Sequence, residues 1–298
     1  MKNLKEYILT ENNFFKNLGI GRKIQTEKWL QEHNELFNKK HHVITIADDG
    51  SLVITVKELA SLSYRHLDVP EYVTVSKIIF EKDSYNYLSL KNMVFEDFKG
   101  FIENVEIEFS NNYFGRDHKT LSIENCNITV DDIKYIPSSF CYLTFVDCPN
   151  LKGNIDITRE CDDFKTDISI KNCKVNKINL NSKSNIITLT IDDVLIDSVD
   201  DINVKNGDLR FLYLKESPLA KIIIKELETL AKEDFNEVTS KDIKSKFNRI
   251  ISKSKTLMEI INKYSEILLI QLSTKKIEVY IEYNPKKRKH YINEVKTK

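Results

Sequence analysis

Adjacent aspartates are the residues of this sequence best suited to bind a divalent cation or to activate water. Paired carboxylates supply the hard oxygen ligands that Mg²⁺ and Ca²⁺ prefer. Each pair, however, stands where a chain reversal is expected, and aspartate favours turns because its side chain bonds the nearby backbone. We therefore interpret the pairs as turn formers and expect no metal. They are Asp48-Asp49, Asp131-Asp132, Asp162-Asp163, Asp192-Asp193 and Asp200-Asp201.

A basic run near the C-terminus is the second candidate for chemistry. Cations interleaved with aromatic residues are typical of nucleic-acid sites. Residues 219–298 carry 18 basic and 11 acidic side chains, which is a modest excess. We expect a solvated hairpin tip, with contact to phosphate groups as the alternative. The run comprises Lys286, Lys287, Arg288 and Lys289, followed by His290 and flanked by Tyr283 and Tyr291.

The sequence lacks the motifs of common enzymes. Seven glycines in 298 residues are few for a phosphate-binding loop, and Gly19-Ile20-Gly21 lacks the third glycine of the dinucleotide motif. Asp117-His118 has no serine or cysteine nucleophile placed at a turn. We therefore expect no enzymatic activity and no cofactor.

Cysteine content predicts reduced thiols. The five cysteines lie within 48 residues, their number is odd, and no CxxC pair occurs. A disulfide framework or a zinc ribbon is therefore not expected, and reduced thiols fit an intracellular compartment.

Composition excludes other classes of protein. Lys plus Arg and Asp plus Glu each total 45, and 41% of residues are hydrophobic, as in ordinary folded proteins. No run of 18 apolar residues occurs, and residues 1–15 lack the apolar core of a secretory signal. We expect no membrane partner.

A repeated pattern begins near residue 87. It reads apolar-x-apolar-x-x-(Cys/Asn/small)-x-apolar, and most of the spacings lie near the leucine-rich-repeat period. A single coil cannot bury its apolar face, so several must stack. The pattern predicts an α+β fold built on an irregular leucine-rich-repeat-like solenoid over residues 87–220. The seven segments start at Leu88, Ile107, Leu121, Leu143, Ile168, Leu189 and Leu212.

One spacing in this series is short. Only 14 residues separate Ile107 from Leu121, which indicates a defective turn or a wrongly set register. At the sixth position of the pattern we expect the chain to turn inward. Cys126, Cys148 and Cys173 share that position, so we expect a stacked, buried ladder rather than a redox or metal cluster.

Outward positions of the expected strands form two rows. The central row reads Ser89, Glu108, Ser122, Thr144, Ser169, Thr190 and Tyr213, and the row before it reads Tyr87, Glu106, Thr120, Tyr142, Asp167, Thr188 and Phe211. Aromatic anchors among hydroxyl groups suit a protein-binding surface on the concave sheet, although ordinary half-exposed strands have a similar composition. The candidate binding residues are Tyr87, Tyr142, Thr144, Ser169, Thr190, Phe211 and Tyr213.

Different elements flank the repeats. A short helix is expected over residues 24–33 and a β-hairpin over 43–46 and 52–56. After Pro218 the apolar period becomes helical, and Ser240 is the expected N-cap of a second helix that reaches Ile267. A last hairpin turns at Asn284-Pro285. The expected division is a segment 1–23, a helix and hairpin cap 24–86, the solenoid 87–220 and a helical and hairpin module 221–298.

Three fragments together resemble a module common in tailed-phage proteins. They are Lys28-Trp29-Leu30-Gln31-Glu32-His33-Asn34, the hairpin Ile44–Ile54 with its Asp48-Asp49-Gly50 turn, and Leu67–Pro70. In that module a "WLdeH" helix leads to a "tInddGtidV" hairpin and then to degenerate leucine-rich repeats. The resemblance covers roughly residues 24–220 and implies no shared catalytic residues. This chain departs from it in its few glycines and uneven repeat lengths.

The first eleven residues resemble the capsid-targeting peptide of internal head proteins in T-even-type phages. That peptide begins Met-Lys, has a Glu-aromatic-Ile core and ends at a glutamate, and a prohead protease cuts after (Leu/Ile)-x-Glu. Leu9-Thr10-Glu11 satisfies this pattern. The resemblance implies processing at Leu9 and Glu11; an amphipathic first helix is the alternative.

These observations lead to one expected function and two alternatives. We expect a non-enzymatic phage protein, a repeat-based scaffold that binds a host or virion protein, located in the virion or the host cytoplasm. The first alternative is a nuclease or toxin-like effector that uses the acid pairs and the basic run. The second is a structural virion component.

Overall fold

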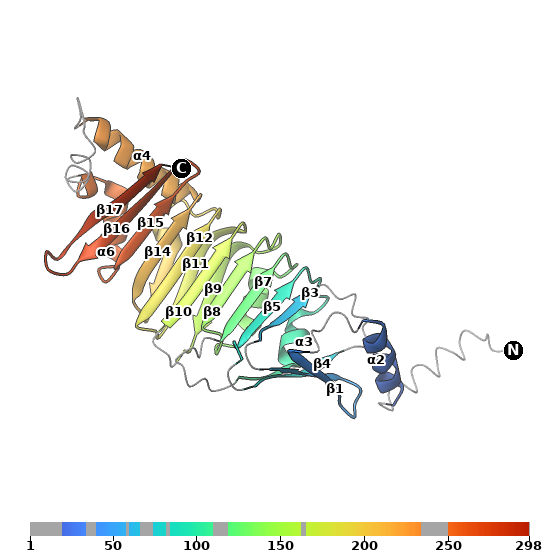
Figure 1. The fold of residues 1–298 in the computed structure, drawn as a ribbon. Helices are drawn as coiled ribbons and strands as arrows, with labels where there is room; N and C mark the ends of the chain where they lie inside the picture. The colour runs from blue at the N-terminus through green and yellow to red at the C-terminus, as the bar shows by residue number, and fades with distance from the viewer. Residues whose placement is uncertain are drawn as a thin grey trace. The chain divides into compact units, whose positions relative to one another are not determined.

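The computed structural model describes residues 20–33, 40–57, 60–65, 74–81, 84–109, 119–161, 165–233 and 250–297. The fold is a β-solenoid of about six turns, which confirms the predicted solenoid (Figure 1). The chain divides into two compact units, Met1–Leu121 and Ser122–Lys298. The boundary falls inside strand β7 (Thr120–Glu124).

The first unit contains two sets of strands. In the first, β1 pairs antiparallel with β2, β2 pairs parallel with β4, and β4 pairs parallel with β6. In the second, β3 pairs parallel with β5. The predicted helix and hairpin are confirmed in α2, β1 and β2. The elements are α2 (Ile20–Glu32), β1 (His42–Ile46), β2 (Leu52–Val56), β3 (Leu62–Arg65), β4 (Val75–Phe80), β5 (Tyr87–Lys91), α3 (Phe98–Glu103) and β6 (Glu106–Glu108).

Helix α2 is hydrogen-bonded to the turn of the first hairpin, between β1 and β2. The hydroxyl of Thr26 donates a 2.8 Å hydrogen bond to the carbonyl of Gly50. Gly50 has φ +82°, and a Cβ there would lie 2.6 Å from the backbone nitrogen of Lys23. Only glycine therefore fits the turn at this close approach. Trp29, 3% exposed, stacks on His33 with ring centroids 5.0 Å apart.

The segment beginning at Ile107 is not a coil of the series, contrary to the prediction. It forms β6, which pairs with β4, whereas the neighbouring segment at Leu88 lies in β5 and pairs with β3. Glu106 and Glu108 both form ion pairs with Lys77 of β4. The 14-residue spacing thus marked a wrongly set register, because it is too short for a coil that must supply two strands.

The second unit stacks its coils through two parallel sheets. One sheet runs β8-β10-β12-β14-β15 in parallel and ends in the antiparallel strands β16 and β17. The other runs β9-β11-β13. The strands are β8 (Tyr142–Val146), β9 (Lys152–Arg159), β10 (Lys165–Lys171), β11 (Lys174–Ser182), β12 (Ile186–Asp192), β13 (Ile202–Lys205), β14 (Leu209–Lys215), β15 (Leu269–Ser273), β16 (Ile277–Asn284) and β17 (Lys289–Thr297).

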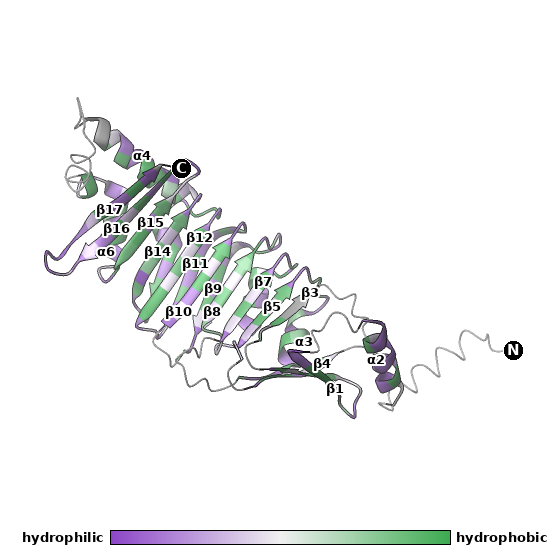
Figure 2. Cartoon of the chain, viewed as in Figure 1, coloured by the Kyte–Doolittle hydropathy of each residue, from purple (hydrophilic) through white to green (hydrophobic). Residues whose placement is uncertain are grey.

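Alternation of inward and outward side chains builds the core of this unit, as predicted. Ile168 and Ile170 of β10 are fully buried, while Ser169 between them is partly exposed. Figure 2 shows the alternating hydropathy along the strands. Equivalent apolar residues stack at the spacing of about 4.8 Å between neighbouring strands. Burying each such side chain contributes roughly 1.5–3 kcal/mol of transfer free energy.

The chain turns at the fifth position of the pattern, one residue before the predicted position. A left-handed residue follows each of the strands β7, β8, β10, β12 and β14, at φ values between 48° and 53°. Its backbone N–H donates to the end of the next strand, as Asn125 does to Val146 at 2.8 Å and Asn172 to Asp192 at 2.8 Å. Asn and Asp tolerate this conformation better than other residues with a side chain. The left-handed residues are Asn125, Asp147, Asn172, Asp193 and Glu216.

The turn directs the sixth residue into the core, where the cysteines stack. Cys126, Cys148 and Cys173 are at most 3% exposed, and the Cys148 thiol donates to the carbonyl of Ile123, one coil earlier. Neighbouring Cys173 and burial raise the pKa of the Cys148 thiol, so it stays protonated. The predicted buried ladder is confirmed.

The expectation of five reduced thiols is wrong. Cys141 and Cys161 form a disulfide, with their Cα atoms 5.8 Å apart. Cys141 directly precedes β8, and Cys161 lies two residues after the end of β9. The stacking of successive coils therefore brings together two cysteines that are 20 residues apart in sequence.

Helical elements join β14 to β15 at the C-terminal end of the second unit. The predicted helix after Pro218 is α4 (Pro218–Glu233). The predicted long helix is interrupted: Ser254 caps a new helix, α6 (Lys255–Lys263), which ends before Ile267. Ser240 lies outside the described residues. The predicted last hairpin is confirmed as β16 and β17. In the described part of the chain, no helix combines the length and apolarity that a membrane span requires.

Candidate functional site

The open side of the β8-β10-β12-β14 sheet carries the two predicted rows in register. Thr144 pairs with Ser169, Ser169 with Thr190, and Thr190 with Tyr213. Two residues earlier along each strand, Tyr142, Asp167, Thr188 and Phe211 form the second row. We call these eight residues the ladder face: Tyr142, Thr144, Asp167, Ser169, Thr188, Thr190, Phe211 and Tyr213.

Most ladder-face side chains are partly exposed. Thr144, Ser169 and Thr190 present a line of hydroxyl groups across three strands, and Phe211 and Tyr213 present rings at its end. Thr188 is 7% exposed and is therefore largely covered, between Asp167 and Phe211 of the neighbouring strands. The face can therefore offer aromatic surface and hydrogen-bonding groups together.

Charge on the ladder face is balanced locally. The ammonium group of Lys165 lies 3.5 Å from the carboxylate of Asp167 and 5.4 Å from the ring centroid of Tyr142. Burial, and then the charge of Asp167, raise the pKa of Tyr213. Its hydroxyl is thus protonated at neutral pH and available as a donor.

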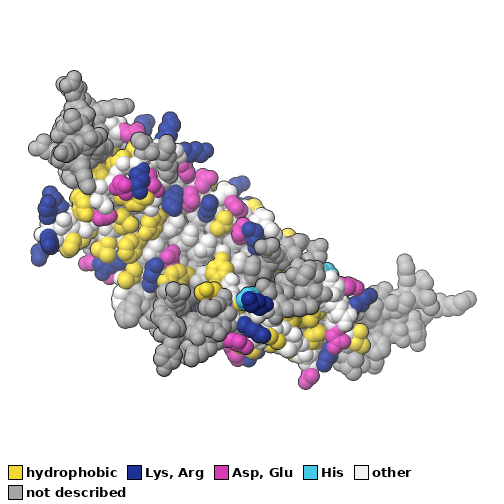
Figure 3. Space-filling view, in the orientation of Figure 1, with side chains coloured by type: hydrophobic (Ala, Val, Ile, Leu, Met, Phe, Trp, Pro, Cys, Tyr) yellow, Lys and Arg dark blue, Asp and Glu magenta, His cyan; other side chains and the backbone are white. Residues whose placement is uncertain are grey.

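The sequence did not reveal how the rows continue. Because β15 pairs with β14, Leu269 lies beside Phe211 and Gln271 beside Tyr213, and Tyr280 of β16 follows Gln271. Gln271 donates to Glu278 and to the Tyr280 hydroxyl. Figure 3 shows hydrophobic side chains gathered over β14, β15 and β16. The only sequence signal was the alternation of the last hairpin.

Tyr87 and the two predicted processing residues are not among the eight residues defined as the ladder face. Tyr87 begins β5 in the first unit, where its side chain is partly exposed. The processing residues Leu9 and Glu11 lie outside the described residues.

The aspartate pairs in the described ranges act as turn and cap residues. Asp132 accepts from the backbone of Thr129 at 2.7 Å, and Asp201 accepts from that of Ser198 at 3.3 Å, each at the start of a 3₁₀ helix. Hydrogen bonds from Ser51 lower the pKa of Asp49. Asp162-Asp163 lies outside the described ranges. Within those ranges, no group of three or more His, Cys, Asp or Glu is placed to hold a metal.

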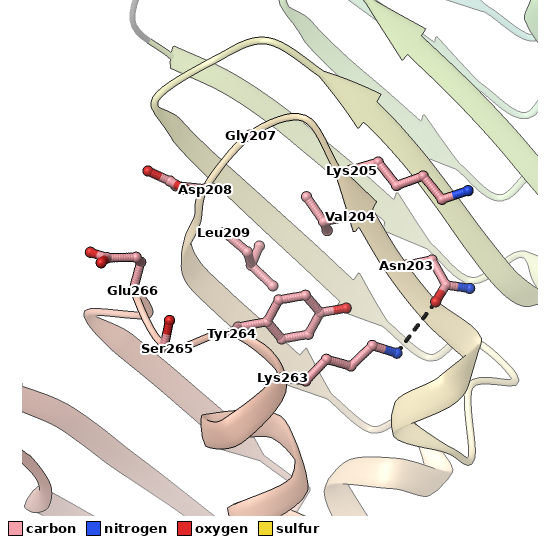
Figure 4. A pocket seen from close by; sticks show the side chains of 10 residues that line it. All are labelled: Asn203, Val204, Lys205, Gly207, Asp208, Leu209, Lys263, Tyr264, Ser265 and Glu266. Atoms are coloured by element: carbon pink, nitrogen blue, oxygen red, sulfur yellow. Dashed lines mark hydrogen bonds between the residues drawn. The ribbon is translucent and has the colours of Figure 1, made fainter.

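A cavity of about 260 Å³ lies between β13 and the end of α6 (Figure 4). Lys263 donates to the carbonyl of Val199 at 3.0 Å and to Asn203 at 3.3 Å, and Tyr264 donates to the carbonyl of Ile202. These hydrogen bonds connect the end of α6 to the last coil. We interpret the cavity as a packing gap beside this connection and not as a binding site.

The basic run occupies the turn between β16 and β17, and all of residues 285–289 are exposed.

A comparison of the chain with protein-family models, with curated proteins and with solved structures found no match.

Proposed function

We propose that the chain is a non-enzymatic, leucine-rich-repeat-like scaffold that binds a partner protein through the ladder face. The observation that carries this proposal is the parallel register of four strands, which places Thr144, Ser169, Thr190 and Tyr213 in one line. Side chains aligned in this way are held by the sheet before binding. A partner would therefore meet a surface that loses little conformational freedom on association.

The chemistry of the ladder face suits a protein partner. Aromatic residues at the centre of an interface supply most of its binding energy, and a polar surround excludes water. Phe211 and Tyr213, extended by Leu269 and Tyr280, provide the aromatic and apolar part. The hydroxyl line and the Lys165–Asp167 ion pair provide the polar part.

Two alternatives remain less well supported. A nuclease or toxin-like effector would need acidic groups converging with a base. The separate turns that hold Asp132 and Asp201 favour the scaffold instead. A structural virion component would assemble into symmetric oligomers, and a monomer in light scattering would argue against it.

The proposed setting is a phage virion, with delivery of the protein to the host cytoplasm. This proposal rests on the resemblance of residues 1–11 to a capsid-targeting peptide. Mass spectrometry of protein from purified particles is expected to show a chain that begins at Asn12. A chain that retains Met1, or absence of the protein from particles, would contradict packaging and leave the binding proposal in place.

Competition between surface variants tests the binding proposal. The triple variant T144K/S169K/T190K adds three charges to the ladder face without entering the core. The control N154K/T158K/N176K adds the same charge at exposed positions of β9 and β11. In affinity capture from infected-cell lysate, a protein retained by the wild type and the control should be lost from the ladder-face variant. Equal retention by all three chains would contradict the proposal.

A further inference from the structure

The turn between β16 and β17, Pro285–Lys289, projects beyond the rest of its sheet. We call it the hairpin tip. Strand β15 pairs with β16 only up to Leu269 and Glu282, so Asn284 and the tip have no β15 neighbour. Figures 1 and 3 show this turn at the edge of the second unit, with Lys and Arg side chains gathered on it.

The hairpin tip is held in a defined conformation. The side chain of Asn284 accepts a 3.0 Å hydrogen bond from the backbone of Lys287, and Arg288 is left-handed with φ 48°. At its base His290 donates to the carbonyl of Ile267 at 2.8 Å, and its ring lies 5.2 Å from that of Tyr283. The cations are therefore presented on a fixed two-stranded ribbon.

Within the described part of the chain, the cations of the tip have no acidic partner, whereas several other cations of this unit do. Arg210 pairs with Asp208 and Glu266, and Lys296 with Glu294. Within the described residues, none of Lys286, Lys287, Arg288 and Lys289 forms an ion pair. The nearest acid before the tip, Glu282, accepts from Tyr291 and Asn293 instead. Four uncompensated charges on five adjacent residues make a strongly positive point on a neutral chain.

We propose that the hairpin tip binds the phosphodiester backbone of a nucleic-acid duplex without sequence specificity. A two-stranded ribbon is narrow enough for the major groove of DNA, which is about 12 Å wide. Lysines and an arginine neutralise phosphates and release counterions. The aromatic rings lie at the base of the tip and are partly buried, so a duplex fits better than a stacked single strand. The tip is separate from the ladder face, so the two proposals can fail independently.

Fluorescence anisotropy with a labelled mixed-sequence DNA duplex, at increasing salt, tests the inference on the full chain. The variant K286Q/K287Q/R288Q/K289Q removes the four charges. The control K152Q/K174Q/K183Q/K205Q removes four charges from exposed positions on and beside β9, β11 and β13. Thermal unfolding of both variants checks that each is folded.

We expect the tip variant to lose about tenfold or more in affinity at low salt. The slope of log K against log salt should become shallower by about 3 to 4, because each phosphate contact contributes about 0.9. The control should retain wild-type affinity. No duplex binding by the wild type, equal losses in both variants, or tighter binding of a single strand would overturn the proposal. So would charge-dependent binding confined to anionic lipid vesicles.

Discussion

The side-chain amide of Asn172 donates a 2.6 Å hydrogen bond to the carboxylate of Asp147, which lies one coil earlier. Both residues are left-handed, and each directly follows a strand of the ladder-face sheet, β8 or β10. Their backbone N–H groups donate to the strand ends of the following coils. The turn residues thus lock each strand to the next and set the register that aligns the ladder face.

Ile170 and Ser169 provide the sharpest test of the alternation of inward and outward side chains in β10. Ile170→Asp places an unpaired carboxylate in the core and should lower the free energy of unfolding by on the order of 4 kcal/mol. Ser169→Asp, directed outward, should change it by less than about 0.5 kcal/mol. Urea unfolding measures both. Equal losses would contradict the inward and outward assignment of β10.

Arg159 is a buried cation held by backbone carbonyls. It is 1% exposed and donates to Ile136 and Pro137 at 3.2 and 2.8 Å. Burial lowers its pKa to about 10, so it remains charged at neutral pH. Arg159→Met keeps much of the volume but leaves both carbonyls without this donor, and should cost about 2 kcal/mol in urea unfolding.

Lys152 begins the same strand and is exposed, so Lys152→Met is the matched control and should be nearly neutral. An Arg159→Met variant as stable as the wild type would show that desolvation of the guanidinium cancels its hydrogen bonds.

The disulfide between Cys141 and Cys161 closes a loop of 20 residues. In the loop-entropy model, C141A/C161A should therefore lose about 3 kcal/mol relative to the oxidised wild type. Thiol titration of the denatured, unreduced protein should find three free thiols among the five cysteines. Five thiols, with no effect of reductant on unfolding, would contradict the bond.

Stability should depend on pH through His290. Burial lowers the pKa of its ring below 6.5 in the folded protein. The unfolded chain therefore binds more protons between the folded and unfolded pKa values, and stability falls as pH drops below 6.5. His290→Gln should flatten this dependence in urea unfolding followed from about pH 7 to pH 5. An unchanged slope would assign the dependence to other groups.

Local patterns in the sequence predicted the coils, the core face and the ladder-face rows. The alternation around Ile170 is visible in five residues, and the repeat makes it recur. The left-handed Asn172 was also visible, as the Asn or Asp before each cysteine, but the turn was assigned to the next position. Pairings between distant segments could not be predicted. Nothing in the sequence near Phe211 indicates that Leu269 lies beside it, because the two residues are 58 positions apart and α4 and α6 lie between them.

Photocrosslinking from the ladder face tests the binding proposal most directly. Benzoylphenylalanine is placed at Tyr213, and at exposed Asn154 of β9 as the control. After irradiation in cells of the proposed phage host that contain the protein, we predict a crosslinked protein partner from position 213 and none from position 154. The same adduct from both positions, or no adduct from position 213, would contradict the ladder face as the site of binding.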